Sequence, residues 1–178
     1  MRARLLVALI GLVVLVSGCS MMGDTAATKA GANETDIKFL RDMLPHHQQT
    51  MEISGLIKGR STTPNLVKIA DAMAAEGSTE IDKMNGWLGE WKTGVSDSGH
   101  QAHEMVVSPK DVALLGSFTG PEFDKQWSAL LARHLRDGVK MAESQTSAGS
   151  HAGVKALAKG MIDAQTSIIS DLERAGGV

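Results

Sequence analysis

Residues 39–57 decide the fold, and they read FLRDMLPHHQQTMEISGLI. Apolar side chains recur every three or four residues in this stretch, which is the period of an amphipathic α-helix. Asp36 stands shortly before the pattern, where a helix N-cap belongs. Pro45 removes one backbone hydrogen bond inside the pattern, so we expect a kink just before His46 and His47. The stretch therefore predicts a long helix that carries two adjacent histidines at a bend.

Similar helical patterns fill most of the remaining chain. We expect four main helices, at residues 35–58, 65–91, 121–145 and 153–174. A short helix is expected from Pro109 or Lys110 to Leu115, within a long connection at residues 93–120. The chain has only three Phe, three Trp and no Tyr, so its core must consist of small and aliphatic residues. This composition favours closely packed helices over a sheet.

The two halves of the chain align at a constant offset of 88 residues without a gap. Several equivalent positions hold identical residues: Asp36 and Asp124, His46 and His134, Ala70 and Ala158, Met73 and Met161, and Ile81 and Ile169. The order of helix and turn repeats as well, so residues 35–92 and 121–174 are interpreted as two copies of one helical hairpin. Two such hairpins bury their apolar faces against each other. We therefore expect an all-α fold, with one four-helix bundle over residues 35–176.

The N-terminal segment has the pattern of a bacterial lipoprotein signal peptide. Residues 1–18 combine a short basic leader with an apolar run that is too short to span a bilayer. The run ends in small residues directly before Cys19, the only cysteine. We expect cleavage before Cys19, lipidation of its thiol, and a flexible tether over residues 19–34. The mature protein would then lie in the cell envelope, anchored to a membrane and outside the cytoplasm. An ordinary signal peptide with a chance cysteine is the alternative.

Charge and missing motifs argue against several classes of function. The formal net charge is −2 and no basic cluster is present, so nucleic-acid binding is not expected. The sequence contains no Gly-rich phosphate loop, Gly-x-Ser-x-Gly elbow or His-Glu-x-x-His motif. None of the six histidines follows a Glu by three residues, as a carboxylate-bridged di-iron bundle requires. No nucleophile–base pair can be named, and we expect a protein that is not an enzyme.

The histidines of residues 39–57 lie among methionines. Met43, His47 and Met51 are spaced by four residues and share one face of the helix. Imidazole binds several transition metals, whereas thioether selects soft ions, above all Cu(I). We therefore predict a copper site, whose candidate ligands are His46, His47, Met43, Met51 and His134. The adjacent histidines are the principal ligands, and His134 would contribute from the facing helix. Alternatively, the methionines only fill the core and His46 is a buried, hydrogen-bonded histidine.

The remaining histidines are weaker candidates. His100 and His103, with a neighbouring carboxylate and thioether, form a second cluster in the connection that could bind Cu(II), Zn(II) or Cu(I). His151 lies in a turn and is expected to be solvated. The second repeat carries Leu135 where His47 predicts another imidazole. We therefore expect the second half of the chain to supply at most one ligand.

Three segments resemble a known family. Met43–Gln48 (MLPHHQ) and Glu80–Met84 (EIDKM), with Gly120–Asp124 (GPEFD) in the second half, resemble the bacterial domain-of-unknown-function 305 family. The resemblance covers roughly residues 35–172, and it implies a ferritin-like four-helix bundle in an exported protein. Some members are associated with copper binding or copper tolerance, although the family has no settled activity. The positions that match its pattern are Met43, His46, His47 and His134.

The chain departs from the family pattern at two positions. Leu135 replaces a histidine that is usual in the second repeat, and Gly77 replaces a frequent glutamine in the first. Gln165 keeps that glutamine in the second repeat. The loss at Leu135 makes a site in each repeat less expected than a site in the first repeat alone.

Two functions of different classes follow from these patterns. The first is a cell-envelope lipoprotein that binds a transition metal, with copper favoured, and is held to the membrane through Cys19. The second is a non-catalytic scaffold that docks a protein partner and needs none of the histidines. An apolar surface patch, together with buried and internally hydrogen-bonded histidines, would favour the scaffold.

Overall fold

The computed structural model describes residues 31–93 and 107–176, which form five α-helices and no strand. The helices are α1 (Glu34–Gly55), α2 (Pro64–Glu90), α3 (Pro109–Leu115), α4 (Gly120–Ala148) and α5 (Ala152–Gly176). The all-α prediction is confirmed, and the four long helices begin and end close to the expected residues. The predicted signal peptide, the lipidation site at Cys19 and the cluster of His100 and His103 lie outside the described residues.

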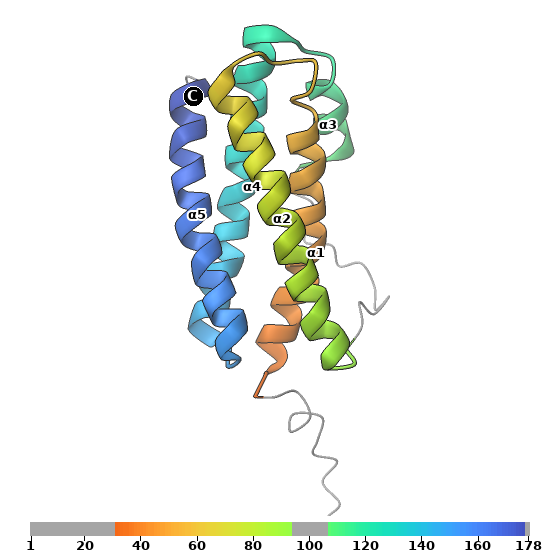
Figure 1. Cartoon of the computed structure of the whole chain (residues 1–178), viewed down its shortest axis with the longest axis vertical. Helices are drawn as coiled ribbons and strands as arrows, with labels where there is room; N and C mark the ends of the chain where they lie inside the picture. Colours follow the sequence, from red (N-terminus) through yellow and green to blue (C-terminus); the bar gives the residue numbers. More distant parts are fainter. Residues whose placement is uncertain (1–30, 94–106, 177–178) are drawn as a thin grey trace, which may run out of the picture.

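The four long helices run side by side along the long axis of the molecule, as Figure 1 shows. Helix α1 packs against α2 and α4, and α4 packs against α5. In this view α1 and α5 run upward, whereas α2 and α4 run downward. The start of α1 therefore lies at the same end of the bundle as the α4–α5 turn. The arrangement is a bundle of two helical hairpins, with α3 as a short additional helix before the second hairpin.

The first turn of α1 is closed by a capping box. The Asn33 side chain accepts the backbone N–H of Asp36 at 3.0 Å, and the Asp36 carboxylate accepts the backbone N–H of Asn33 at 2.7 Å. The prediction that Asp36 is the N-cap was wrong by three positions, because Asn33 has the extended backbone and the accepting side chain of an N-cap. Helix α1 continues through Pro45, which is exposed.

Two aspartates connect the hairpins in a reciprocal way. Asp36 of α1 is fully buried, and its carboxylate accepts the backbone N–H groups of Ser150 and His151 in the α4–α5 turn. Asp124 of α4 accepts the hydroxyl proton of Thr63, the residue that precedes α2. These contacts obey the 88-residue offset, because Asp124 is equivalent to Asp36 and His151 is equivalent to Thr63. Each hairpin therefore holds the start of the second helix in the other hairpin.

The core consists of two apolar clusters. The lower cluster, near the α4–α5 turn, includes Met43, Met84 and Met161. The upper cluster, near the α1–α2 turn, includes Ile53, Leu66, Trp127 and Leu172. Between the clusters lie polar residues that each long helix contributes at the same level, namely His46, His47, Thr50, Glu80, His134 and Gln165. We call this set the polar layer.

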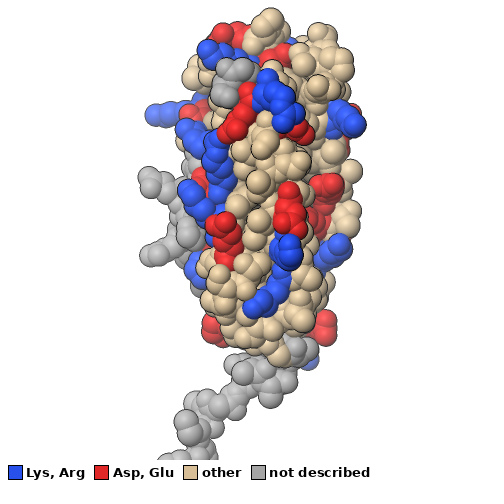
Figure 2. Space-filling model, turned by 90° about the vertical axis from the view of Figure 1, so that its left-hand side faces the viewer, with Lys and Arg blue, Asp and Glu red and all other residues tan. Residues whose placement is uncertain are grey.

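The surface carries no single-signed tract on the face that Figure 2 displays. Lys and Arg side chains alternate there with Asp and Glu, and apolar or neutral residues lie between them. Several ion pairs of the bundle join residues of one helix, such as Lys159 with Asp163 on α5. Among the described residues, no helix is both long enough and apolar enough to cross a bilayer.

Candidate functional site

His46 and His134 form the centre of the polar layer. Their rings stack with centroids 3.8 Å apart and planes inclined by only 6°. The Nε2 atom of His46 lies 3.1 Å from the carbonyl oxygen of His134, and the Nε2 atom of His134 lies 3.2 Å from the carbonyl oxygen of His46. The internal repeat predicts that these two residues face each other, and the structure places them on facing sides of α1 and α4.

The backbone contacts fix which nitrogen carries the proton in each stacked ring. A carbonyl oxygen only accepts, so both Nε2 atoms donate. Thr50 extends this arrangement, because its hydroxyl accepts from His134 Nε2 at 2.9 Å and donates to the His46 carbonyl at 3.0 Å. The Nδ1 atoms of both rings are buried and have no hydrogen-bond partner among the described residues.

Burial keeps the stacked pair uncharged. It lowers the pKa of His46 to about 3, and the neighbouring His134 adds to this effect. Burial also lowers the pKa of His134, whose side chain is almost wholly enclosed. Both imidazoles are therefore neutral near pH 7, and each Nδ1 atom keeps its lone pair.

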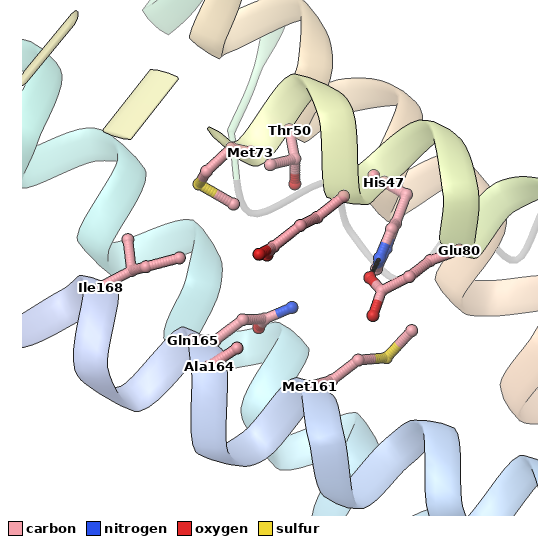
Figure 3. A pocket seen from close by; sticks show the side chains of 10 residues that line it. His47, Thr50, Met73, Glu80, Met161, Ala164, Gln165 and Ile168 are labelled. Carbon is pink, nitrogen blue, oxygen red and sulfur yellow. Dashed lines mark hydrogen bonds and ion pairs between the residues drawn. The ribbon is translucent and has the colours of Figure 1, made fainter. Parts of the chain in front are cut away.

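His47 points away from the stacked pair toward α2. Its Nε2 atom lies 2.7 Å from a carboxylate oxygen of Glu80, and Figure 3 shows the two side chains in contact. The His47 side chain is 5% exposed and the Glu80 side chain 23%. The Nδ1 atom of His47 is also buried without a partner among the described residues. The ring centroid of His47 lies 6.1 Å from that of His46.

A small cavity adjoins His47 between α1, α2 and α5 (Figure 3). Its volume of about 20 Å³ is room for one water molecule or one ion. His47 and Thr50 of α1 line it, together with four pairs of repeat-equivalent residues: Met73 and Met161, Glu76 and Ala164, Gly77 and Gln165, and Glu80 and Ile168. The cavity therefore lies where the two repeats meet, and both repeats present a thioether to it.

The cavity wall contains residues that spacing along one helix does not reveal. Met73, Met161 and Glu80 come from α2 and α5, and only the fold brings them to His47. The signal for the two methionines was their equivalence at the 88-residue offset. Nothing in the α1 sequence indicates that Glu80 is the partner of His47.

The structure separates the methionines of the predicted ligand set from the cavity. Met43 is fully buried in the lower apolar cluster. Met51 is half-buried and packs behind Gly77, where its Cγ atom would lie 3.4 Å from a Cβ atom added to the glycine. Of the five predicted ligands, only His47 lines the cavity. His46 and His134 lie beside it, linked to its wall through Thr50.

The donor types suit a soft or borderline metal ion, but the rings are not arranged around one point. A histidine lone pair lies in the plane of its ring, and two stacked parallel planes share no point. The Nδ1 atoms of His46 and His134 therefore cannot bind one ion unless a ring turns. Over the two described ranges, no group of three or more His, Cys, Asp or Glu residues could hold a metal ion. A set around His47 has to include thioether ligands.

His151 is not the solvated residue that its place in a turn suggested. Its ring meets the edges of Trp87 and Trp91, with centroids 5.6 and 5.0 Å away. Its Nδ1 atom accepts the backbone N–H of Val154 at 3.2 Å, which caps the first turn of α5. The prediction was wrong because the end of α2 covers this turn.

Comparison with known proteins agrees with this architecture. The sequence matches the family described as "Domain of unknown function (DUF305)" over residues 36–175. A DUF305 protein of Streptomyces coelicolor, named as a candidate secreted protein, is 28% identical, with a TM-score of 0.72 over 79% of this chain and 89% of that one. A DUF305 fragment from Deinococcus radiodurans is 22% identical, with a TM-score of 0.73 over 83% of this chain and 98% of that one.

A protein named CopM, solved in its Cu(II)-bound form, shares the fold as well. It is 23% identical, with a TM-score of 0.70 over 80% of this chain and 95% of that one. No curated protein sequence matches the chain significantly. The family match covers the whole bundle, and the solved relatives have the same helical architecture. The chain therefore belongs to the DUF305 family.

Proposed function

We propose that this protein binds copper as Cu(I) in the polar layer, beside His47. One observation carries the proposal: three imidazoles in one layer each keep a buried ring nitrogen that has no hydrogen-bond partner among the described residues. A buried polar atom without a partner is costly, and a native fold keeps such an atom only where something offsets it. A bound metal ion would satisfy the His47 nitrogen, and that of His46 or His134 once its ring turns.

The surrounding side chains favour a soft ion. Met73 and Met161 reach the cavity from opposite repeats, and thioether sulfur prefers Cu(I) over Zn(II) or Mg(II). We propose His47 with these two methionines as the nearest ligand set, and His46 or His134 as a further ligand after its ring turns. Met43 and Met51, which the sequence also suggests as ligands, are not part of this set. Copper would supply no reaction in this proposal, since the protein only holds the ion.

The comparisons support copper in a limited way. CopM has been solved in Cu(I)-bound, Cu(II)-bound and Ag-bound forms, and Ag(I) is a soft ion like Cu(I). We also propose that the protein works in the cell envelope as a lipoprotein anchored through Cys19. The sequence of residues 1–19 supports this location, and the Streptomyces relative is named as a candidate secreted protein.

Titration with Cu(I) and Zn(II) tests the function directly. Residues 24–178 lack Cys19, whose free thiol would itself bind Cu(I), so this fragment reports the bundle. Wild type should bind Cu(I) in competition with a chromophoric chelator, and His46→Ala/His47→Ala should bind far less. His151→Asn is the matched control, because it removes a histidine outside the polar layer and keeps a capping side chain. Binding that persists in the double variant would refute this site. Loss only after changes at His100 and His103 would move the site to the connection.

A scaffold role remains the second candidate, and two observations favour it. His134 is buried and His46 is half-buried, and each ring is hydrogen-bonded to the other's backbone, as in a purely structural pair. Leu114 is 61% exposed beside a shallow hollow between α3 and α4, whose apolar wall includes Phe118 and Leu130. A stoichiometric protein partner that is retained in the presence of chelators, and by His46→Ala/His47→Ala, would favour this role over copper binding.

A further inference from the structure

This inference rests on the proposed function and concerns how the same site is prepared for its ion. We infer that Glu80 is a positioning residue, which fixes the orientation and the tautomer of the His47 ring. In this role the carboxylate would not bind the metal. It would hold the Nε2 proton of His47 and so leave Nδ1 as the nitrogen with a free lone pair.

The contact between the two side chains determines the proton. Glu80 Oε2 lies 2.7 Å from His47 Nε2, a normal length for a charge-assisted hydrogen bond. A carboxylate has no proton to donate, so Nε2 carries the hydrogen. The other ring nitrogen, Nδ1, is buried and has no hydrogen-bond partner among the described residues. A neutral His47 therefore has its lone pair on the one nitrogen that nothing in the described fold uses.

The second repeat offers an internal comparison. The positions equivalent to His47 and Glu80 are Leu135 and Ile168, so both partners are replaced by aliphatic residues. A stable bundle thus forms around an aliphatic pair at these positions. Removing only one partner of a partly buried polar pair leaves the other uncompensated, which is destabilising. The joint presence in one repeat and joint absence in the other indicate that the two residues act as a unit.

The arrangement matches what metal-binding histidines generally need. Such a histidine usually donates its second ring N–H to a carboxylate or carbonyl, which sets its tautomer and raises its basicity. Loss of that outer partner typically weakens metal affinity by about 10- to 100-fold. Backbone carbonyls accept the Nε2 proton of His46 and of His134. The Nε2 proton of His47 is accepted instead by a side chain of another helix. This difference makes the role of Glu80 accessible to mutation.

The test compares two substitutions of Glu80 by two independent measurements. The samples are the full chain with Cys19→Ser, which removes the competing thiol. Glu80→Gln keeps an oxygen that accepts from His47 Nε2, and Glu80→Ile copies the second repeat. The first measurement is the ¹⁵N NMR signature of the His47 tautomer in the metal-free protein. The second is Cu(I) affinity by chelator competition, with thermal unfolding to verify that each variant is folded.

We expect the Nε2–H tautomer in wild type and in Glu80→Gln, and a mixed or reversed tautomer in Glu80→Ile. Copper affinity should fall by about 10- to 100-fold in Glu80→Ile and clearly less in Glu80→Gln. Glu76→Ala is the matched control. It removes a carboxylate from the same cavity, copies Ala164 of the second repeat, and should leave the tautomer at its wild-type value.

Each contrary result has a distinct meaning. A proton on Nδ1 of His47 in wild type would overturn the inference, as would an Nε2–H tautomer and wild-type copper affinity in Glu80→Ile. An equal loss of affinity in Glu76→Ala would show that the cavity only needs negative charge. If wild type has the Nε2–H tautomer but binds no Cu(I), the proposed function is refuted. The inference that Glu80 fixes the tautomer of His47 would still be supported.

Discussion

The two repeats of the bundle have nearly the same backbone plan and different chemistry. Each supplies one ring of the stacked pair, His46 or His134, and one methionine of the cavity, Met73 or Met161. The first repeat adds polar side chains at three positions where the second is apolar: His47 against Leu135, Glu76 against Ala164, and Glu80 against Ile168. The features present in both repeats include the aspartates that hold the hairpins together, and side chains that the proposed site also uses. What sets the first repeat apart is the pair of His47 and Glu80 beside the cavity.

The largest expected effect concerns the two aspartates that link the hairpins. Asp36 is fully buried, and its carboxylate accepts backbone N–H groups at the start of α1 and in the α4–α5 turn, whereas Asp124 is half-buried and accepts one hydroxyl. Hydrogen bonds to a buried charge contribute more than neutral ones, so Asp36→Ala should lower the free energy of unfolding by about 3 kcal/mol and Asp124→Ala by about 1 kcal/mol. Urea unfolding of both variants measures the difference. Equal decreases in the free energy of unfolding would show that the two aspartates contribute equally to the contact between the hairpins.

Asp36 should also make the stability of the protein depend on pH in the acid range. Burial alone would raise the pKa of Asp36, but hydrogen bonds from Asn33, Gln145, Ser150 and His151 outweigh it and hold the pKa below its ordinary value of 3.8. Because the folded-state pKa is lowered, this stabilisation is complete above the ordinary value and is lost as pH falls through the folded-state pKa. Asp36→Asn should therefore flatten the fall in stability at the acid end of a pH series of urea unfolding curves. If Asp36→Asn loses stability at acid pH as steeply as wild type, other residues cause the acid dependence.

A double substitution tests whether the chemistry of the first repeat can be removed without harm to the fold. His47→Leu/Glu80→Ile copies the second repeat at both positions. A tenfold or greater loss of Cu(I) affinity is expected, which corresponds to at least about 1.4 kcal/mol. Replacing a largely enclosed polar pair such as this one, whose Glu80 side chain is 23% exposed, by aliphatic residues is often neutral or stabilising, so the melting temperature should hold or rise. A collapse in melting temperature would mean that the pair serves the fold.

The smallest expected effects on stability come from substituting one glycine in each repeat by alanine. A Cβ atom at Gly77 of α2 would meet only the flexible Met51 side chain, at 3.4 Å, and the helix would gain a better helix former. Gly77→Ala should therefore stabilise the protein by up to about 1 kcal/mol. A Cβ atom at Gly138 of α4 would lie 2.7 Å from His46 Cε1 and 2.8 Å from Gln165 Oε1. Gly138→Ala should destabilise by about 1 kcal/mol or more, because the stacked ring has to move. Thermal unfolding of both variants provides the comparison.

The fold could be predicted from the sequence because helical periodicity is a local signal and because the 88-residue repeat shows the same helical hairpin twice. The repeat also predicted that His46 and His134 face each other. The site could be predicted only in part, because spacing along α1 shows which side chains share a face and not what lies opposite. Met43 shares a face with His47, yet neighbouring helices enclose it in the lower cluster. Glu80, which pairs with His47, comes from another helix and carries no mark of that pairing in the sequence.

The buried carboxylate of Asp36 has a mechanical consequence for a protein held by its N-terminal end. Asn33 donates to the carbonyl of Ala148 and the hydroxyl of Ser150, both at 2.9 Å, so the start of α1 is fastened to the α4–α5 turn. Force arriving along the polypeptide that precedes Asn33 would be shared between both hairpins at this point. His47 lies on the order of 20 Å farther along the chain from Asn33, at 1.5 Å rise per helical residue. In a lipid-anchored protein, tension on the tether would therefore load several bonds in parallel before it could strain the polar layer.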